Sequence, residues 1–83
     1  MNGQEVNTLI KHGAIDNVRQ KLKKLGIEQR MKTLQECLPF VGTSNATLKF
    51  FKEHFSMEIG ALMMAEQDIE KAVTLYRTAK SYK

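Results

Sequence analysis

Few side chains in this sequence have the potential for catalysis or metal binding. Cys37 and His54 could act as a nucleophile and a general base, but neither a third orienting group nor an oxyanion-hole loop accompanies them. A lone cysteine more often behaves as a small buried hydrophobic residue. The spacing of His12, Cys37 and His54 matches none of the ligand patterns of zinc sites. We therefore predict a protein that is not an enzyme and that uses no metal or cofactor.

Basic side chains suggest a different chemistry, the binding of polyanions. The 83-residue chain has 13 Lys/Arg and 9 Asp/Glu, which gives a net charge of +4. The excess lies in residues 1–34, with seven cations and three acids, since residues 35–83 have six of each. One predicted helix carries the cations that we expect to contact phosphates: Arg19, Lys21, Lys23 and Lys24. The alternative is that they form the solvated face of an amphipathic helix.

Length and composition limit the architecture to a single domain, residues 1–83. One cysteine cannot form an intramolecular disulfide, which argues against a small secreted scaffold. Residues 1–20 lack the continuous apolar stretch of a signal peptide, and the longest uncharged run, residues 37–48, is too short to span a bilayer. We expect a cytoplasmic protein without membrane contact. Its modest core would gain stability from pairing with a second copy or a partner.

Apolar periodicity predicts an all-α fold of four or five helices, the last of them the longest. Asn2, followed three residues later by Glu5, resembles a capping box that begins a short first helix ending near residue 12. A second helix is predicted over Asp16–Leu25, with Asp16 as its cap. A third begins at Ile27 and should end or kink near Leu38, because Pro39 would break its hydrogen bonding.

The next helix is predicted to start at residue 43 or 44. One of its faces is apolar and carries Leu48, Phe51 and Phe55. Beyond it, either Ser56 caps a separate helix, or one helix continues to about residue 81. The continuous form would be roughly 57 Å long at 1.5 Å per residue. We favour the break, because a helix of that length does not fit a compact chain of this size.

The segment from residue 33 to residue 55, TLQECLPFVGTSNATLKFFKEHF, joins two apolar-periodic stretches through Gly42 and a Thr-Ser pair. It resembles the helix-turn-helix unit of DNA-binding regulators. The resemblance implies that the second helix enters the major groove, where Asn and Lys contact base edges and Ser contacts phosphate. The implied contact residues are Ser44, Asn45, Lys49 and Lys52. The alternative is an ordinary helical hairpin within a bundle.

The C-terminal part of the chain is the best candidate for a protein-binding surface. Apolar residues between 62 and 79 approximate a heptad seam, and three methionines add side chains that adapt to irregular partners. Phe50 lies off the apolar face of its helix, so we expect it to be an exposed contact. The predicted partner-binding residues are Phe50, Ile59, Leu62, Met63, Ile69, Val73 and Tyr76. The alternative is that this stripe packs onto the protein's own core.

Two functions follow from these observations. The leading hypothesis is a small nucleic-acid-binding regulator that uses the helix-turn-helix-like unit and the basic helix, and that dimerises through the C-terminal seam. The alternative is a small helical adaptor, chaperone or inhibitor that acts by binding a protein through its C-terminal amphipathic helix. The first hypothesis requires the basic residues to contact DNA, whereas the second gives them a solubilising role.

Overall fold

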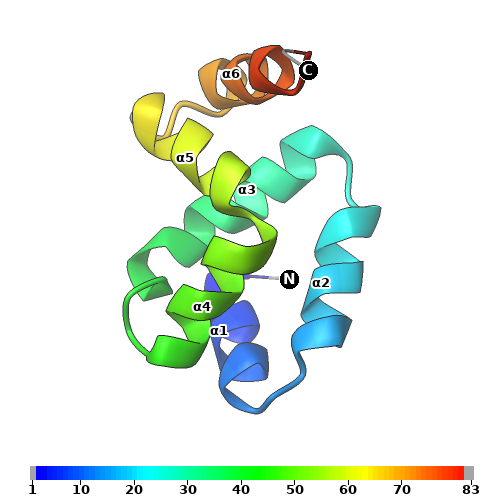
Figure 1. Ribbon diagram of the computed structural model, residues 1–83, viewed down its shortest axis with the longest axis vertical. Coiled ribbons are helices and arrows are strands. Elements are labelled where there is room, and N and C mark those ends of the chain that lie inside the picture. Colours follow the sequence, from blue (N-terminus) through cyan, green and yellow to red (C-terminus); the bar gives the residue numbers. More distant parts are fainter. Residues whose placement is uncertain (1, 82–83) are drawn as a thin grey trace.

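The computed structural model describes residues 2–81, and this part of the chain is helical and contains no strand (Figure 1). It has six α-helices and one short 3₁₀ helix: α1 (Gly3–Lys11), α2 (Ile15–Lys24), α3 (Ile27–Cys37), η1 (Leu38–Phe40), α4 (Asn45–His54), α5 (Ser56–Met64) and α6 (Ile69–Ser81). The predicted all-α class is confirmed, as is the prediction that the last helix is the longest. The predicted number of helices was too low, because the chain breaks once more than we expected.

The N-terminal half follows the predicted boundaries closely. Asn2 caps α1, with its Oδ1 accepting a hydrogen bond from the Glu5 N–H at 2.9 Å. The second helix starts one residue earlier than predicted, and Asp16 lies in its first turn rather than at its cap. α3 ends at Cys37, and the 3₁₀ turn η1 accommodates Pro39. This ending confirms the effect expected of the proline.

The C-terminal half contains two breaks. Ser44 caps α4, and the chain bends at Phe55 before α5 begins, so the favoured break is confirmed. Ser56 is not the cap that we predicted: it is the first residue of α5, and no side chain caps this helix. A second break between α5 and α6 was not predicted. Glu66 and Gln67 adopt positive φ angles of 51° and 65°, and Asp68 Oδ1 then accepts a hydrogen bond from the Lys71 N–H at 3.2 Å. α6 therefore folds back against α5 instead of continuing it (Figure 1).

One core joins all six helices. α1 packs against α2, α3 and α4, while α3 also contacts α5 and α6. At the centre, the ring centroid of Phe50 lies 5.2 Å from that of Phe51 and 5.8 Å from that of Phe55. The fully buried side chains are mainly aliphatic and aromatic: Val6, Ile10, Val18, Leu22, Met31, Leu34, Cys37, Phe50, Phe55 and Leu62. Thr47 is also fully buried and donates a hydrogen bond from Oγ1 to Asn7 Oδ1 at 3.1 Å, which ties α4 to α1.

Candidate functional site

The residues predicted to contact DNA on α4 are mostly accessible. Asn45, Lys49 and Lys52 are all exposed. Lys49 Nζ lies 4.0 Å from Glu53 Oε1, but both side chains are exposed, so this ion pair contributes little. Ser44 is half-buried, and its hydroxyl accepts a hydrogen bond from the Thr47 N–H as the cap of α4. Its predicted contact with phosphate would compete with this capping role.

The predicted cations of α2 do not lie on one face of the helix. Lys23 lines a cleft on the side of α3, whereas Lys21 and Lys24 line a shallow hollow next to Glu5 of α1. Arg19 is half-buried and pairs with Asp16 of its own helix at 3.4 Å. A row of phosphate contacts would need these cations on a common side. The structure instead distributes them around the helix.

Four of the predicted partner-binding residues are buried in the core, and that part of the prediction is wrong. Phe50 is 2% exposed because its ring packs against the rings of Phe51 and Phe55. Leu62, Val73 and Tyr76 are 0%, 5% and 8% exposed. The unexpected break before α6 explains this burial. When α6 folds back, the seam residues of α5 and α6 pack within the monomer and are no longer available to a second chain.

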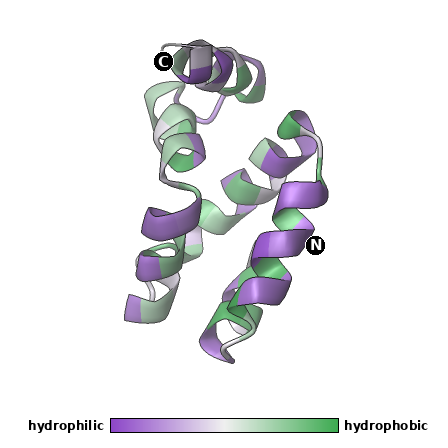
Figure 2. Cartoon of the chain, turned by 45° about the vertical axis from the view of Figure 1, so that its right-hand side comes forward, coloured by the Kyte–Doolittle hydropathy of each residue, from purple (hydrophilic) through white to green (hydrophobic). Residues whose placement is uncertain are grey.

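The apolar residues that remain exposed lie mainly on α4 and α5. Met57 is 47% exposed, Met63 67% and Met64 75%, and Leu48, which we expected in the core, is 37% exposed. The predicted partner residues Ile59 and Ile69 are half-buried. α5 has one charged residue in nine, and Figure 2 shows it largely in green and white. A helix that is apolar on all sides is normally buried, but one side of α5 is not covered by residues 2–81.

Two hollows flank this exposed side of α5, and Gly60 lines both of them. The first, of about 380 Å³, lies between α5 and α6 and includes Met57, Met64 and Leu75. The second, of about 280 Å³, lies between α4 and α5 and includes Leu48. We call the following set the α5 surface: Leu48, Met57, Ile59, Gly60, Met63, Met64 and Leu75. Residues from three helices therefore make one apolar surface.

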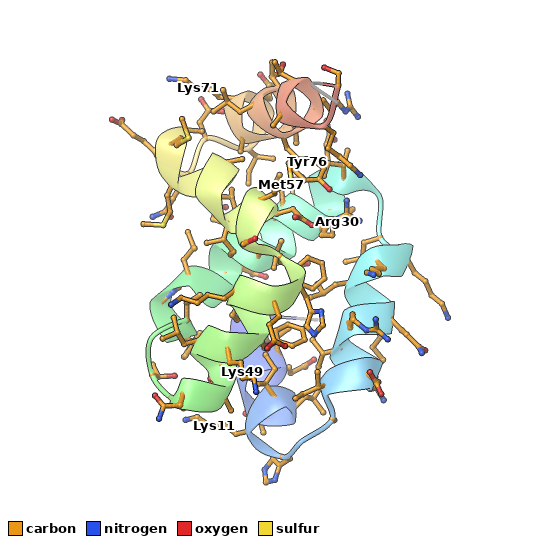
Figure 3. All side chains as sticks on the ribbon, in the orientation of Figure 1. Lys11, Arg30, Lys49, Met57, Lys71 and Tyr76 are labelled. Carbon is orange, nitrogen blue, oxygen red and sulfur yellow. The ribbon has the colours of Figure 1, made fainter. Side chains whose placement is uncertain are left out.

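A basic cleft of about 470 Å³ adjoins the α5 surface. It lies among α2, α3, α4, α5 and α6, and we define it by its polar lining residues: Lys23, Arg30, Glu53, His54, Ser56, Glu58, Tyr76 and Lys80. Arg30 Nε is 3.6 Å from Glu58 Oε2, which is an ion pair but too long for a hydrogen bond. Lys80 Nζ lies 5.3 Å from the centre of the Tyr76 ring. Met57 and Tyr76 line both the cleft and the hollow between α5 and α6. Figure 3 labels these two side chains and Arg30.

Glu58 is the most perturbed acid of the site. The residue is 7% exposed, and this burial raises the pKa of its carboxyl group above the ordinary value of 4.5. Two effects lower the pKa without cancelling that of burial. The carboxylate accepts a hydrogen bond from its own backbone, and it lies near the positive charges of Arg30, Lys80 and Lys23. Sequence reasoning missed both Arg30 and Glu58, which lie on different helices. The sequence did contain one signal: Glu58 is the one charged residue in the stretch of residues 55–65.

Cys37, which was considered as a nucleophile and a metal ligand, is buried. Cys37 is 1% exposed, and burial raises the pKa of its thiol to about 12, so it stays protonated at neutral pH. Within residues 2–81, no group of three or more His, Cys, Asp or Glu side chains is arranged to bind a metal ion. In the same part of the chain, no helix is both long and apolar enough to cross a membrane.

Comparisons of this chain with protein-family models, with curated proteins and with solved structures find no match. The functional argument therefore depends on the two surfaces described above, the α5 surface and the basic cleft.

Proposed function

We propose that this protein acts by binding another protein through the α5 surface. The observation that carries the proposal is the exposure of Met57, Met63 and Met64 on a helix that has one charged residue in nine. Contiguous exposed apolar residues on a small protein are typical of interaction sites. Methionine side chains adapt their shape to a partner, as at other protein-binding surfaces.

An amphipathic helix of the partner fits this surface best. The hollow between α5 and α6 is elongated by the two helices, and its lining includes the small residues Gly60, Ala61 and Ala79. Small residues allow the backbone of a docked helix to approach closely, and apolar side chains at helical spacing would enter the hollow. Lys52 lines the hollow between α4 and α5, and Lys80 lines the adjoining basic cleft, so acidic residues on the flanks of the partner helix would be favoured.

The test uses NMR of the full chain labelled at its methionine methyl groups. The probe is a model amphipathic peptide with a leucine face and glutamate flanks. We expect saturable shifts for Met57, Met63 and Met64, while the fully buried Met31 stays unchanged. Substitution Gly60→Gln should abolish the shifts by filling the hollows, because nothing lies within 4 Å of a Cβ atom at this position. Equal binding by the Gly60→Gln variant would disprove the proposed surface.

Matched controls separate this binding from charge attraction. Lys49→Ala removes an exposed cation of α4 outside the α5 surface and should leave the peptide shifts unchanged. A peptide of the same pattern with lysine flanks should bind more weakly than the glutamate form. If both peptides and both variants behave alike, the contact is non-specific and the proposal fails.

A second candidate function, DNA binding, is favoured by one observation. Asn45, Lys49 and Lys52, which the helix-turn-helix resemblance assigns to the groove, are all exposed on α4. Fluorescence anisotropy with mixed-sequence duplex DNA, between about 50 and 200 mM salt, tests it. DNA binding predicts a steep loss of affinity with salt and a weaker complex for Lys49→Ala but not for Gly60→Gln. Absence of binding at the lowest salt concentration would eliminate this candidate.

A further inference from the structure

We infer that the basic cleft is a binding subsite for a small anionic group, a carboxylate or a phosphate. This inference does not depend on the proposed function, because the cleft has its own lining and its own charge. It adjoins the α5 surface through Met57 and Tyr76, so the anion has two sources: an acidic side chain of a docked partner, or a free small molecule.

Cations from three helices converge on the cleft. Lys23 comes from α2, Arg30 from α3 and Lys80 from α6. Against these three positive charges the lining has two acids, Glu53 and Glu58. The cleft is therefore positive overall.

The donors of Arg30 are not fully used by the protein. Its Nε is buried and has no hydrogen-bond partner in residues 2–81, because the nearest acceptor, Glu58 Oε2, is 3.6 Å away. Because this Nε atom is buried, an anion in the cleft would bond to the Nη–H groups at the end of the same guanidinium. A planar guanidinium with several N–H groups is well suited to a carboxylate or a phosphate.

The start of α5 adds a second set of donors. Ser56 and Met57, at the N-terminus of this nine-residue helix, line the cleft, and no side chain caps the helix. The first N–H groups of a helix have no acceptor within the helix, and the helix dipole favours negative charge at this end. Because Ser56 and Met57 line the cleft, their backbone N–H groups would complement the side chains of Lys23 and Lys80 as ligands for one anion.

The burial of Glu58 fits the same conclusion. An ionised Glu58 carboxylate would repel a bound anion, and burial, which raises the pKa of this group, disfavours the ionised form. The other titratable or charged groups that face the cleft are Lys23, Arg30, Glu53, His54, Tyr76 and Lys80. Burial raises the pKa of Glu58, and its protonation would make the cleft more positive, so affinity for an anion of constant charge should rise as pH falls.

Two titrations of the full chain, followed by ¹⁵N NMR, test the inference. The first probe is inorganic phosphate at constant ionic strength. The second is a pair of amphipathic peptides that differ by one central residue, Glu or Gln. We expect saturable shifts of the Ser56 and Met57 backbone amides and of the Arg30 side-chain Nε–H. Saturation by phosphate indicates a free small anion, whereas a preference for the Glu peptide indicates a partner's side chain.

Substitutions at exposed lysines distinguish a defined site from general attraction. Lys23→Ala and Lys80→Ala should each weaken binding roughly threefold, because each removes one partly exposed charge from the cleft. Lys21→Ala and Lys49→Ala, which remove cations outside it, should leave the affinity unchanged. All four lysines are exposed, so the variants should remain folded.

Two results would overturn the inference. One is a linear, unsaturated response to phosphate together with equal binding of the Glu and Gln peptides. The other is an equal loss of affinity in the cleft variants and the control variants. If both peptides shift the methionine methyl groups equally and phosphate does not saturate, the α5 surface stands and the anion subsite fails. If the response to phosphate saturates and neither peptide binds, the anion subsite stands and the α5 surface fails.

Discussion

Gly3 and Gly60 are both helical glycines, but their surroundings are opposite. A Cβ atom at Gly3 would overlap the carbonyl oxygen of Glu36, because α1 crosses the end of α3 at this point. A Cβ atom at Gly60 would meet nothing within 4 Å. The first glycine is therefore required by packing, and the second leaves a hollow open at the surface.

The same substitution should have opposite effects at these two positions. Gly3→Ala forces a backbone contact apart and should lower the free energy of unfolding by about 1–3 kcal/mol. Gly60→Ala should raise it by up to about 1 kcal/mol, since alanine favours an exposed helix. Urea denaturation followed by circular dichroism measures both values. Equal changes at the two positions would show that α1 and α3 can separate without cost.

The buried carboxyl of Glu58 predicts a pH effect on stability. Its folded pKa lies above its ordinary value of 4.5, so the folded state binds the proton more tightly than the unfolded state. Stability from this group therefore increases as pH falls through the folded pKa towards 4.5. Urea denaturation at pH 7 and pH 5 should show that the native protein gains stability relative to Glu58→Gln at the lower pH. A gain at pH 7 instead would contradict the burial argument.

At the scale of elements, the break between α5 and α6 determines which apolar residues are exposed. Positive φ angles at Glu66 and Gln67 reverse the chain, and Asp68 caps the helix that follows. Gln35 of α3 supports the turn from the other side, with its Nε2 donating a hydrogen bond of 2.6 Å to the Gln67 carbonyl oxygen. Without this reversal, α5 and α6 would present a continuous seam to another chain.

The contribution of the Asp68 cap to the free energy of unfolding should be measurable on its own. Asp68→Ala removes the acceptor of the Lys71 N–H and should cost about 1 kcal/mol of stability. Asp16→Ala is a suitable control, because Asp16 forms an exposed ion pair with Arg19 and its removal should change stability by less than about 0.5 kcal/mol. Chemical denaturation of both variants gives the comparison. A larger effect at Asp16 would show that this turn is not fixed by its cap.

At the scale of the whole molecule, the seam residues Leu62, Val73 and Tyr76 are buried within the monomer and stabilise it. Leu62→Ala creates a cavity where the side chain is fully buried and should lower the free energy of unfolding by about 2–5 kcal/mol. Met64→Ala, at a side chain 75% exposed, should change it by less than about 0.5 kcal/mol. Denaturation should be independent of protein concentration. A midpoint that rises with concentration would indicate that folding is coupled to dimerisation.

The sequence by itself determined the helical class and most helix boundaries. Local signals were sufficient there, because capping by Asn2 and Ser44 and the break at Pro39 depend on neighbouring residues. The break at Phe55 was also predicted. The turn at Glu66 and Gln67 was not, because neither residue type favours a positive φ and the turn depends on contacts with α3.

Only the tertiary structure decided which residues are available to partners. Helical periodicity identifies an apolar face but does not say what covers it, so Phe50 and Tyr76 were predicted to be contacts and are buried. Arg30 and Glu58 lie 28 positions apart in the sequence, and the packing of α3 against α5 brings them together. Such a cleft has no sequence pattern, because its residues come from helices whose order along the chain does not determine their neighbours in space.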